Sequence, residues 1–388
     1  MVACIGIVLV SSGTVVFAQT PSPYVLGFTL DLTGMRADIS MGPRRSAQIK
    51  IDEINAAGGI NGRQLRAIFY DGESDPVKNV KNVKRIVEVD KAVACMGFAA
   101  VDASLASLKT AEDGKTLLIS GAPCIVSGRS PQKWLFSTCG DQKVASIPEL
   151  IKNLLDRGSK KIAYIYIDTA FGALGNAAFK SSCEKLGITP AIIEKYVPSV
   201  VDLSPQIAHI QASGADGLLI TGNVADTVKV LKTARDHGIT YPIVCDYAIT
   251  GPDFIPLAGK YGEGIVTTGQ RAIVAHDLPD TDIQKKVCVE LYDKYAKQFG
   301  AYNNYAGHGW DQVTLIAAAL RKINPKLDPA KEKDLDKIRV DLRDGLENLK
   351  GVVGVSGVFN YSETDHLGLA EGCYPALVVR DGKWRLYK

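Results

Sequence analysis

The order of secondary structure from Tyr24 to Pro76 constrains the fold of this chain more than any other feature. An apolar run at 24–30 is typical of a strand covered on both faces of a parallel sheet. A helix is expected next, because apolar residues recur at i, i+4 and i+7 and make one buried stripe: Ala47, Ile51 and Ile54. A second strand is predicted at 64–70. Strand, helix and strand in about fifty residues form a βαβ unit.

The loop after this helix, residues 56–62, has the sequence AAGGING. Gly58 and Gly59 are placed to end the helix, because glycine enters the left-handed conformation of a C-terminal cap without a side-chain clash. The second strand returns into a turn-rich stretch at 71–76, where Pro76 is well placed to begin another helix.

Alternating strands and helices continue to residue 246 in two series. The first series is predicted at 80–87, 92–98, 103–113 and 116–120, and the second at 147–157, 161–167, 172–186, 191–197, 205–212, 216–221, 225–237 and 241–246. Two similar Rossmann-like halves follow from this repetition, and a length of 388 residues suits two domains.

The tail is expected to pack on these sheets instead of forming a third domain. Helices are predicted near 281–299, 310–323 and 333–349, and strands at 352–360, 374–380 and 383–387. Asp381 and Gly382 between the last two strands indicate a hairpin turn.

Charge and motifs exclude several function classes. A formal net charge of +3, from 45 basic and 42 acidic residues, comes without a Lys/Arg-rich block, so nucleic acid is not an expected partner. Neither a CxxC motif nor a Cys or His pair at zinc-like spacing occurs, so no metal is expected. No GxGxxG opens the first helix and no GxSxG elbow occurs; we therefore expect no cofactor and no enzyme.

The first 18 residues have the pattern of an export signal. An apolar run at 4–10 is followed by Val16 and Ala18, small enough for the −3 and −1 positions of a cleavage site, which predicts a mature chain from Gln19. No Lys or Arg precedes the apolar run, which leaves the true translation start open. The pattern predicts a protein exported to the periplasm.

Seven of the eight cysteines follow this segment, and an odd number leaves at least one free thiol. Cys124 and Cys139 flank strands that are expected to be neighbours, so they are the pair to test for a disulfide. Burial of both as small hydrophobic side chains is the alternative.

Several short motifs occur along the chain in a fixed order. They are LTG at 32–34, DEINAAGGING at 52–62, Tyr70-Asp71 with Asp75-Pro76, Ala163, Asp168 and Phe171-Gly172, Ala234-Arg235 with Gly238, and GHGWD at 307–311. In this order, over nearly the whole predicted mature length, the chain resembles the type I periplasmic binding proteins of the leucine/isoleucine/valine-binding family. These are the receptors of ABC importers.

The resemblance implies an α/β fold of two Rossmann-like lobes joined by three crossovers, near residues 141, 268 and 353. Lobe 1 would comprise 24–141 plus 268–352, and lobe 2 would comprise 142–267 plus 353–388. A small molecule would bind between the lobes, at the carboxyl ends of the strands, and stabilise the closed state by touching both.

In the first lobe the resemblance places ligand contacts in three loops. The candidates are Arg36, Ile39, Ala100, Val101, Asp102, Ala122 and Cys124. The family usually has serines where this chain has Ala100 and Val101, so we expect backbone N–H groups at the start of the following helix to hold a ligand carboxylate. Arg36 could add a charge-assisted hydrogen bond.

In the second lobe the candidates are Phe171, Asn223, Asp246 and Tyr247. The acidic residue that pairs with a ligand ammonium in the family aligns nearest to Tyr247, and Asp246 is one position away. Successive strand residues face opposite ways, so this offset can remove the carboxylate from the cleft. Hydrophobic amino acids are the expected ligands, with branched-chain ones first, and aromatic or aliphatic acids without an amino group are the alternative.

The expected role is that of a monomeric solute receptor that delivers its ligand to ABC permease subunits in the inner membrane. A second role is open to the same fold, because family relatives also deliver ligands to signalling partners. The sequence does not separate transport from sensing.

Overall fold

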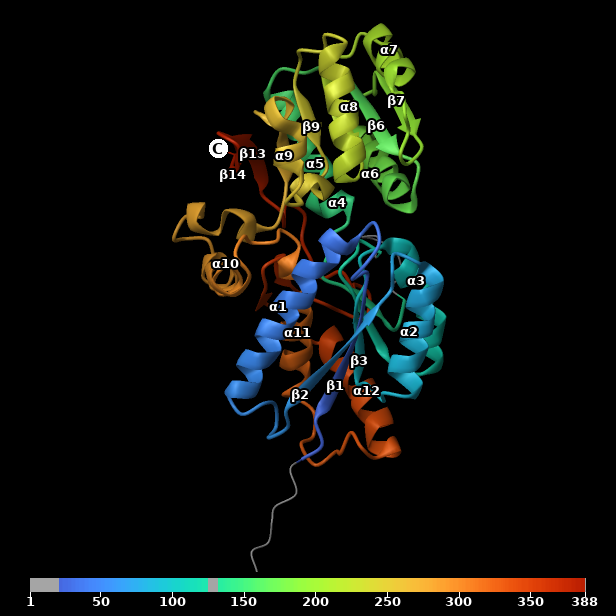
Figure 1. Ribbon diagram of the computed structural model, residues 1–388, viewed down its shortest axis with the longest axis vertical. Helices are drawn as coiled ribbons and strands as arrows, with labels where there is room; N and C mark the ends of the chain where they lie inside the picture. The colour runs from blue at the N-terminus through green and yellow to red at the C-terminus, as the bar shows by residue number, and fades with distance from the viewer. Residues whose placement is uncertain (1–20, 125–131, 388) are drawn as a thin grey trace, which may run out of the picture.

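The computed structural model describes residues 21–124 and 132–387, which form two α/β lobes stacked end to end (Figure 1). The predicted signal peptide, residues 1–18, lies outside the described residues. Within the described ranges, no helix combines the length and the apolar character needed to cross a bilayer.

The first lobe is built on a five-stranded parallel sheet with the order β2-β1-β3-β4-β5. Its strands are β1 (Tyr24–Leu30), β2 (Leu65–Asp71), β3 (Ala94–Gly97), β4 (Leu117–Ser120) and β5 (Leu135–Ser137). One face is covered by α1 (Ala37–Ala56) and α11 (Ala306–Leu320), and the other by α2 (Pro76–Glu88) and α3 (Val101–Asp113) (Figure 1). Helix α12 (Glu332–Glu347) packs beside α11. All seven residues of β1 are buried, as the apolar run predicts.

The second lobe is built on a seven-stranded sheet with the order β14-β13-β10-β9-β8-β6-β7. Five strands are parallel: β6 (Ile162–Ile167), β7 (Ile192–Tyr196), β8 (Gly217–Thr221), β9 (Ile243–Cys245) and β10 (Val266–Thr268). Successive residues of β6 alternate between two cores, with Ile162 and Tyr164 on one face and Ala163 and Ile165 on the other. The sheet is therefore buried on both faces.

Helices cover both faces of this second sheet. The core that contains Ile162 is completed by α5 (Ile147–Asp156) and α6 (Ala170–Leu186). The other core is completed by α7 (Ser204–Ala212), α8 (Val224–Asp236) and α9 (Phe254–Ala258). Three 3-10 helices, η1 (Tyr247–Thr250), η2 (Gly259–Gly262) and η3 (Arg271–Asp277), and the helices α4 (Gln142–Ala145) and α10 (Lys285–Phe299) complete the structure.

The glycine-rich loop ends α1 as predicted. The helix stops at Ala56, and Gly58 and Gly59 have φ of +96° and +79°. A Cβ atom on Gly59 would lie 2.1 Å from the carbonyl oxygen of Arg63, so this position requires glycine for space as well as for conformation.

The two C-terminal hairpins differ in how well the sequence predicts them. Strands β13 (Ala376–Arg380) and β14 (Lys383–Leu386) pair antiparallel around Asp381 and Gly382, both with positive φ, which confirms the predicted turn. The single strand predicted at 352–360 is wrong, because β11 (Val352–Val353) and β12 (Val358–Phe359) form a small separate hairpin. The buried carboxylate of Asp311 accepts hydrogen bonds from the N–H groups of Val355 and Ser356, each at 2.8 Å, and turns the chain there.

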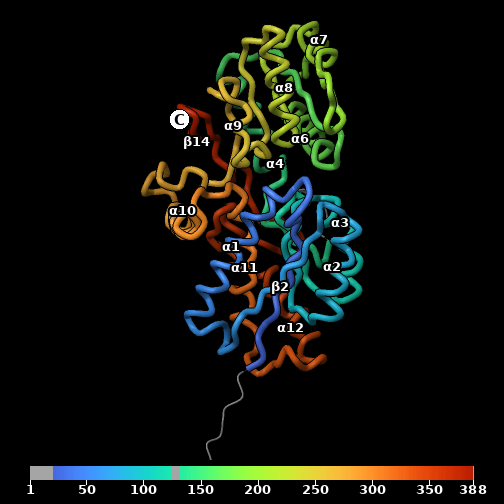
Figure 2. Tube along the Cα trace, in the orientation of Figure 1, coloured from blue at the N-terminus to red at the C-terminus, as the bar shows by residue number. Residues whose placement is uncertain are grey.

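The chain passes between the lobes three times. It leaves the first sheet after β5 and enters α4, and it leaves the second sheet after β10. Tyr361, Leu367 and Cys373 still belong to the first core, and the C-terminal trace then rises to β13 and β14 in the second lobe (Figure 2). We therefore propose a third crossover at residues 374–376 in place of residue 353, and otherwise keep the predicted lobe boundaries as a proposal.

All seven described cysteines are buried free thiols. Cys124 and Cys139 are among them. The structure therefore shows the alternative, two small buried side chains, and not the disulfide. Burial raises the pKa of the Cys124 thiol to about 11. These thiols are accordingly neutral at physiological pH.

Candidate functional site

The carboxyl ends of the parallel strands of both lobes face each other, and the loops that follow them meet at the junction between the lobes, where the ligand cleft is predicted (Figure 1). Phe171 follows β6 and packs against hydrophobic cores of both lobes. Its half-buried ring meets the ring of Tyr247 edge to face, with 5.9 Å between centroids. Phe171 thus lies at the junction of the lobes, and its contact with a ligand stays a prediction.

Tyr247 is turned toward the crossovers. Its hydroxyl donates to the carbonyl oxygen of Gly140 at 3.2 Å, and its ring contacts that of Tyr374 edge to face at 5.7 Å. Only 8% of Tyr247 is exposed. The side chain therefore fills the junction between the lobes, and its contact with a ligand stays a prediction.

Asp246 is fully buried, and both of its carboxylate oxygens already have partners. Oδ1 accepts from the hydroxyl of Ser146 at 2.5 Å and from the N–H of Tyr247 at 2.7 Å, and Oδ2 accepts from the hydroxyl of Thr221 at 3.2 Å. Burial raises the pKa of Asp246 to about 6, against the opposing effect of these hydrogen bonds. The carboxylate serves as the N-terminal cap of η1.

Arg36 lies at the N-terminus of α1 and is held by the first lobe. Its Nε atom is 2.8 Å from Asp31 Oδ2, and Nη2 donates to the carbonyl oxygen of Ser74 at 2.9 Å. Asp31 is almost completely buried. The guanidinium group orders the loop after β1, and Ile39 lies half-buried in the first turn of α1.

The start of α3 is the predicted anion site. Ala100 is the N-cap and provides no side-chain hydrogen bond, which leaves N–H groups of the first turn open to a ligand. Val101 is buried, and the exposed Asp102 uses its own carboxylate to accept from the N–H of Ala103 at 2.9 Å. Asp102 therefore occupies one of the donors that a carboxylate ligand would otherwise find.

Ala122 and Cys124 are both buried, and buried serines that the sequence reasoning missed hold their loop. Ser120 is buried, and its Oγ accepts a hydrogen bond from the N–H of Ala122 at 2.9 Å and lies 2.8 Å from Ser104 Oγ. Ser137 Oγ donates to the carbonyl oxygen of Ala122 at 3.0 Å. The signal for these residues was present, because Ser120 and Ser137 each end an otherwise apolar strand.

Asn223 caps α8. Its Oδ1 accepts from the N–H of Asp226 at 2.9 Å, and its Nδ2 donates to Asp226 Oδ2 at 2.9 Å. The residue is exposed at the carboxyl end of β8, but its side chain has a structural role.

Asp38 is a further charged residue near the junction of the lobes. It is half-buried in the first turn of α1, and burial, followed by the charge of Asp253 in the other lobe, raises the pKa of its carboxyl group. The described residues contain no group of His, Cys, Asp and Glu that could hold a metal ion.

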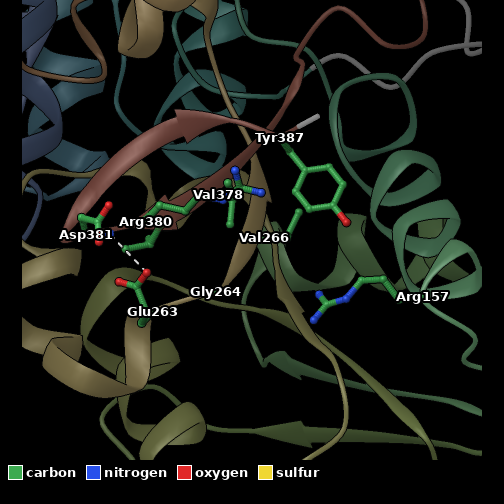
Figure 3. A pocket seen from close by; sticks show the side chains of 9 residues that line it. Arg157, Glu263, Gly264, Val266, Val378, Arg380, Asp381 and Tyr387 are labelled. Carbon is green, nitrogen blue, oxygen red and sulfur yellow. Dashed lines mark hydrogen bonds between the residues drawn. The ribbon is translucent and has the colours of Figure 1, made fainter.

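A separate hollow of about 500 Å³ lies in the second lobe, away from the cleft (Figure 3). Val266 and Val378 line it together with Arg157 and Tyr387, and Glu263 lies on the opposite side. Val266 begins β10, so the hollow is at the amino ends of the parallel strands. It is distinct from the cleft at their carboxyl ends.

The family description "Periplasmic binding protein" matches residues 23–383, and the chain belongs to this family. Its likeness to the leucine/isoleucine/valine-binding type is confirmed by its relatives. An "Amino acid binding protein" of Pseudomonas aeruginosa is 25% identical over 63% of this chain and 66% of its own length. A "Leucine-, isoleucine-, valine-, threonine-, and alanine-binding protein" of the same organism is 24% identical over 77% and 78%.

Solved structures show the same fold. An extracellular ligand-binding receptor from Rhodopseudomonas palustris HaA2 superimposes with a TM-score of 0.81, 25% identity and coverage of 94% of this chain and 99% of the other. The substrate-binding protein LivJ of Streptococcus pneumoniae, in complex with isoleucine, gives a TM-score of 0.76 at 21% identity, covering 93% and 97%. The predicted fold, two lobes of the type I periplasmic binding protein class, is confirmed.

Proposed function

We propose that this chain is the receptor of an ABC importer and captures a hydrophobic amino acid, with branched-chain amino acids as the first class to test. The observation that carries the proposal is Phe171, which packs against the cores of both lobes at their junction. A solute that rests on this ring and on the start of α3 touches both lobes, and only such a solute favours the closed state. The names of the relatives support the ligand class.

The proposal also covers the location and the partners of the receptor. The receptor would act in the periplasm after loss of residues 1–18, as a monomer without a catalytic role, and would pass its solute to permease subunits in the inner membrane. Membership of the periplasmic binding protein family supports this location and these partners.

A second class of ligand, carboxylic acids without an amino group, is favoured by one observation. Asp246 is fully buried, and its oxygens are already bonded to Ser146, Thr221 and Tyr247. An amino-acid ligand must find another acceptor for its ammonium group, because an uncompensated buried charge is unfavourable. An acid without the amino group has no such need.

A thermal-shift screen of the mature chain separates the two classes. A ligand at a hundred times its Kd stabilises the folded state by ~2.7 kcal/mol, which raises the melting temperature measurably. Shifts with leucine, isoleucine and valine support the first class. Shifts with aromatic or aliphatic carboxylates alone support the second, and no shift with any of them contradicts the proposed ligand chemistry.

The variant Phe171→Ala tests the position of the site. We expect the affinity for whichever solute binds to fall by about tenfold or more, since removal of an aromatic wall loses roughly 1.5–3 kcal/mol of apolar burial. Phe299→Ala, at the end of α10, removes a partly exposed aromatic ring outside the cleft and serves as the control. Equal affinities of the two variants would place the site elsewhere.

A further inference from the structure

A direct contact between residues of the chain joins the two lobes. Tyr305 Oη donates to the carbonyl oxygen of Ala248 at 2.8 Å, and Asn304 Nδ2 donates to the carbonyl oxygen of Thr250. Tyr305 and Asn304 directly precede α11 of the first lobe, while both carbonyls belong to η1 of the second. We refer to these two hydrogen bonds as the latch.

The carbonyl groups are available because η1 is short. The last carbonyls of a helix have no partner within the helix and need donors from elsewhere. Asp246 caps the start of η1, and Thr250 Oγ1 donates to the carbonyl oxygen of Tyr247 at 2.9 Å, so the beginning of the turn is satisfied within the second lobe. Its end is satisfied from the first lobe by the latch.

The donor side of the latch is fixed to the first lobe. Asn303 Nδ2 donates to the carbonyl oxygen of Asp38 at 3.0 Å, and Ser46 Oγ donates to the carbonyl oxygen of Ala306 at 2.5 Å. Gly42 leaves the space that Asn303 fills, because a Cβ atom there would lie 2.2 Å from Asn303 Oδ1. The loop therefore moves with α1 when the lobes move.

The acceptor side is fixed to the second lobe in the same way. Ile249 is fully buried in the core beneath α8 and α9, and the N–H of Ile249 returns to the carbonyl oxygen of Asp246. Gly251 packs against the Tyr305 ring, since a Cβ atom on it would be 3.4 Å from Cε2. Each latch bond therefore joins a residue held in one lobe to a residue held in the other.

We propose that Tyr305 and Asn304 are positioning residues for solute capture, because they cap η1 from the opposite lobe and hold part of the population closed before any solute binds. This inference rests on hinge closure, which belongs to the proposed function, but it makes no use of the identity of the solute. The apparent affinity for a solute is the intrinsic affinity multiplied by the fraction of molecules that are already closed. A receptor with a larger closed fraction before binding therefore has an apparent affinity closer to its intrinsic affinity.

The test measures the opening of the ligand-free mature chain. Spin labels on Glu112→Cys in α3 and Lys180→Cys in α6 report the distance across the cleft by pulsed electron resonance; both positions are exposed, whereas the described native cysteines are buried. Tyr305→Phe removes one latch bond and keeps the ring. We expect the ratio of closed to open molecules to fall roughly fivefold, the effect of one net hydrogen bond.

Tyr302→Phe is the matched control, because Tyr302 is a buried tyrosine of the same loop whose hydroxyl has no hydrogen-bond partner among the described residues. It should leave the distance distribution unchanged, and Asn304→Ala should shift it in the direction of Tyr305→Phe. A ligand-free wild-type chain that is entirely open overturns the proposal, as does a Tyr305→Phe distribution equal to that of the wild type. If no solute binds, the proposed function is contradicted, but the distance measurement on the ligand-free chain still tests the latch.

Discussion

Two buried aspartates, Asp246 in the second lobe and Asp311 in the first, hold the backbone with different sets of donors. Asp311, on α11 of the first lobe, accepts from two backbone N–H groups, those of Val355 and Ser356, and a side-chain hydrogen bond from Ser356 also lowers its pKa. Asp246, after β9 of the second lobe, accepts from one backbone N–H and two hydroxyl groups. Burial raises the pKa of each to about 6. Hydroxyl groups can reverse their role and backbone N–H groups cannot, so the two sites should respond differently to the same change.

The amide variants should show this difference most strongly. In Asp311→Asn one acceptor oxygen becomes an NH₂ group that faces a backbone N–H, so a buried donor loses its partner and a charge-assisted bond is lost. We expect the free energy of unfolding to fall by about 3–4 kcal/mol. Denaturant titration at pH 7 measures this loss.

Asp246→Asn is the matched control for that loss. The new NH₂ group can donate to the hydroxyl oxygen of Thr221, while the remaining oxygen keeps Ser146 and the Tyr247 N–H. We expect its stability at pH 7 to stay within about 1 kcal/mol of the wild type or to rise. A larger loss in Asp246→Asn than in Asp311→Asn would refute the distinction between hydroxyl and backbone donors.

The second prediction concerns pH. Asp246 has its pKa raised from 3.8 to about 6 in the folded state, so the folded state binds the proton more tightly than the unfolded one. Its contribution to stability is full below about pH 3.8 and is lost as the pH rises through about 6, a change of up to about 3 kcal/mol. Asp246→Asn lacks this contribution at every pH.

The wild type should therefore lose stability relative to Asp246→Asn between pH 4 and pH 7. Asp311 is present in both chains, so its own titration cancels from the difference. Stability curves measured by denaturant at several pH values give the comparison, and two parallel curves would show that the carboxyl group of Asp246 titrates with an ordinary pKa.

The same two aspartates show how far the sequence alone could predict this molecule. Local signals were sufficient for the βαβ opening, for the glycines that end α1 and for the turn at Asp381, because turn and cap chemistry acts within a few residues. The strand predicted at 352–360 failed, because Asp311, more than forty residues away in the chain, binds the backbone of Val355 and Ser356.

The candidate site shows the same limit. The position of Phe171 after a strand predicted that it lies at the carboxyl end of the second sheet, and it packs against the cores of both lobes there. The sequence could not show that the carboxylate of Asp246 already accepts a hydrogen bond from Ser146. Ser146 lies 100 positions earlier, and only the folded chain brings its hydroxyl to 2.5 Å from that carboxylate. Arg36 likewise has a buried partner, Asp31, that its loop position did not reveal. Whether a side chain is free to bind a solute depends on such distant partners.

The smallest expected effect separates the two hydroxyl groups that bind Asp246. Ser146 donates at 2.5 Å and Thr221 at 3.2 Å, so the shorter bond should stabilise the ionised carboxylate more. Ser146→Ala should raise the pKa of Asp246 further, by about one unit, and Thr221→Val should raise it by less, because each removes a donor that lowers this pKa. Carboxyl carbon NMR of the two variants measures both shifts. Equal shifts would mean that the two hydroxyls stabilise the charge equally, and an unchanged pKa in Ser146→Ala would contradict the role given to Ser146.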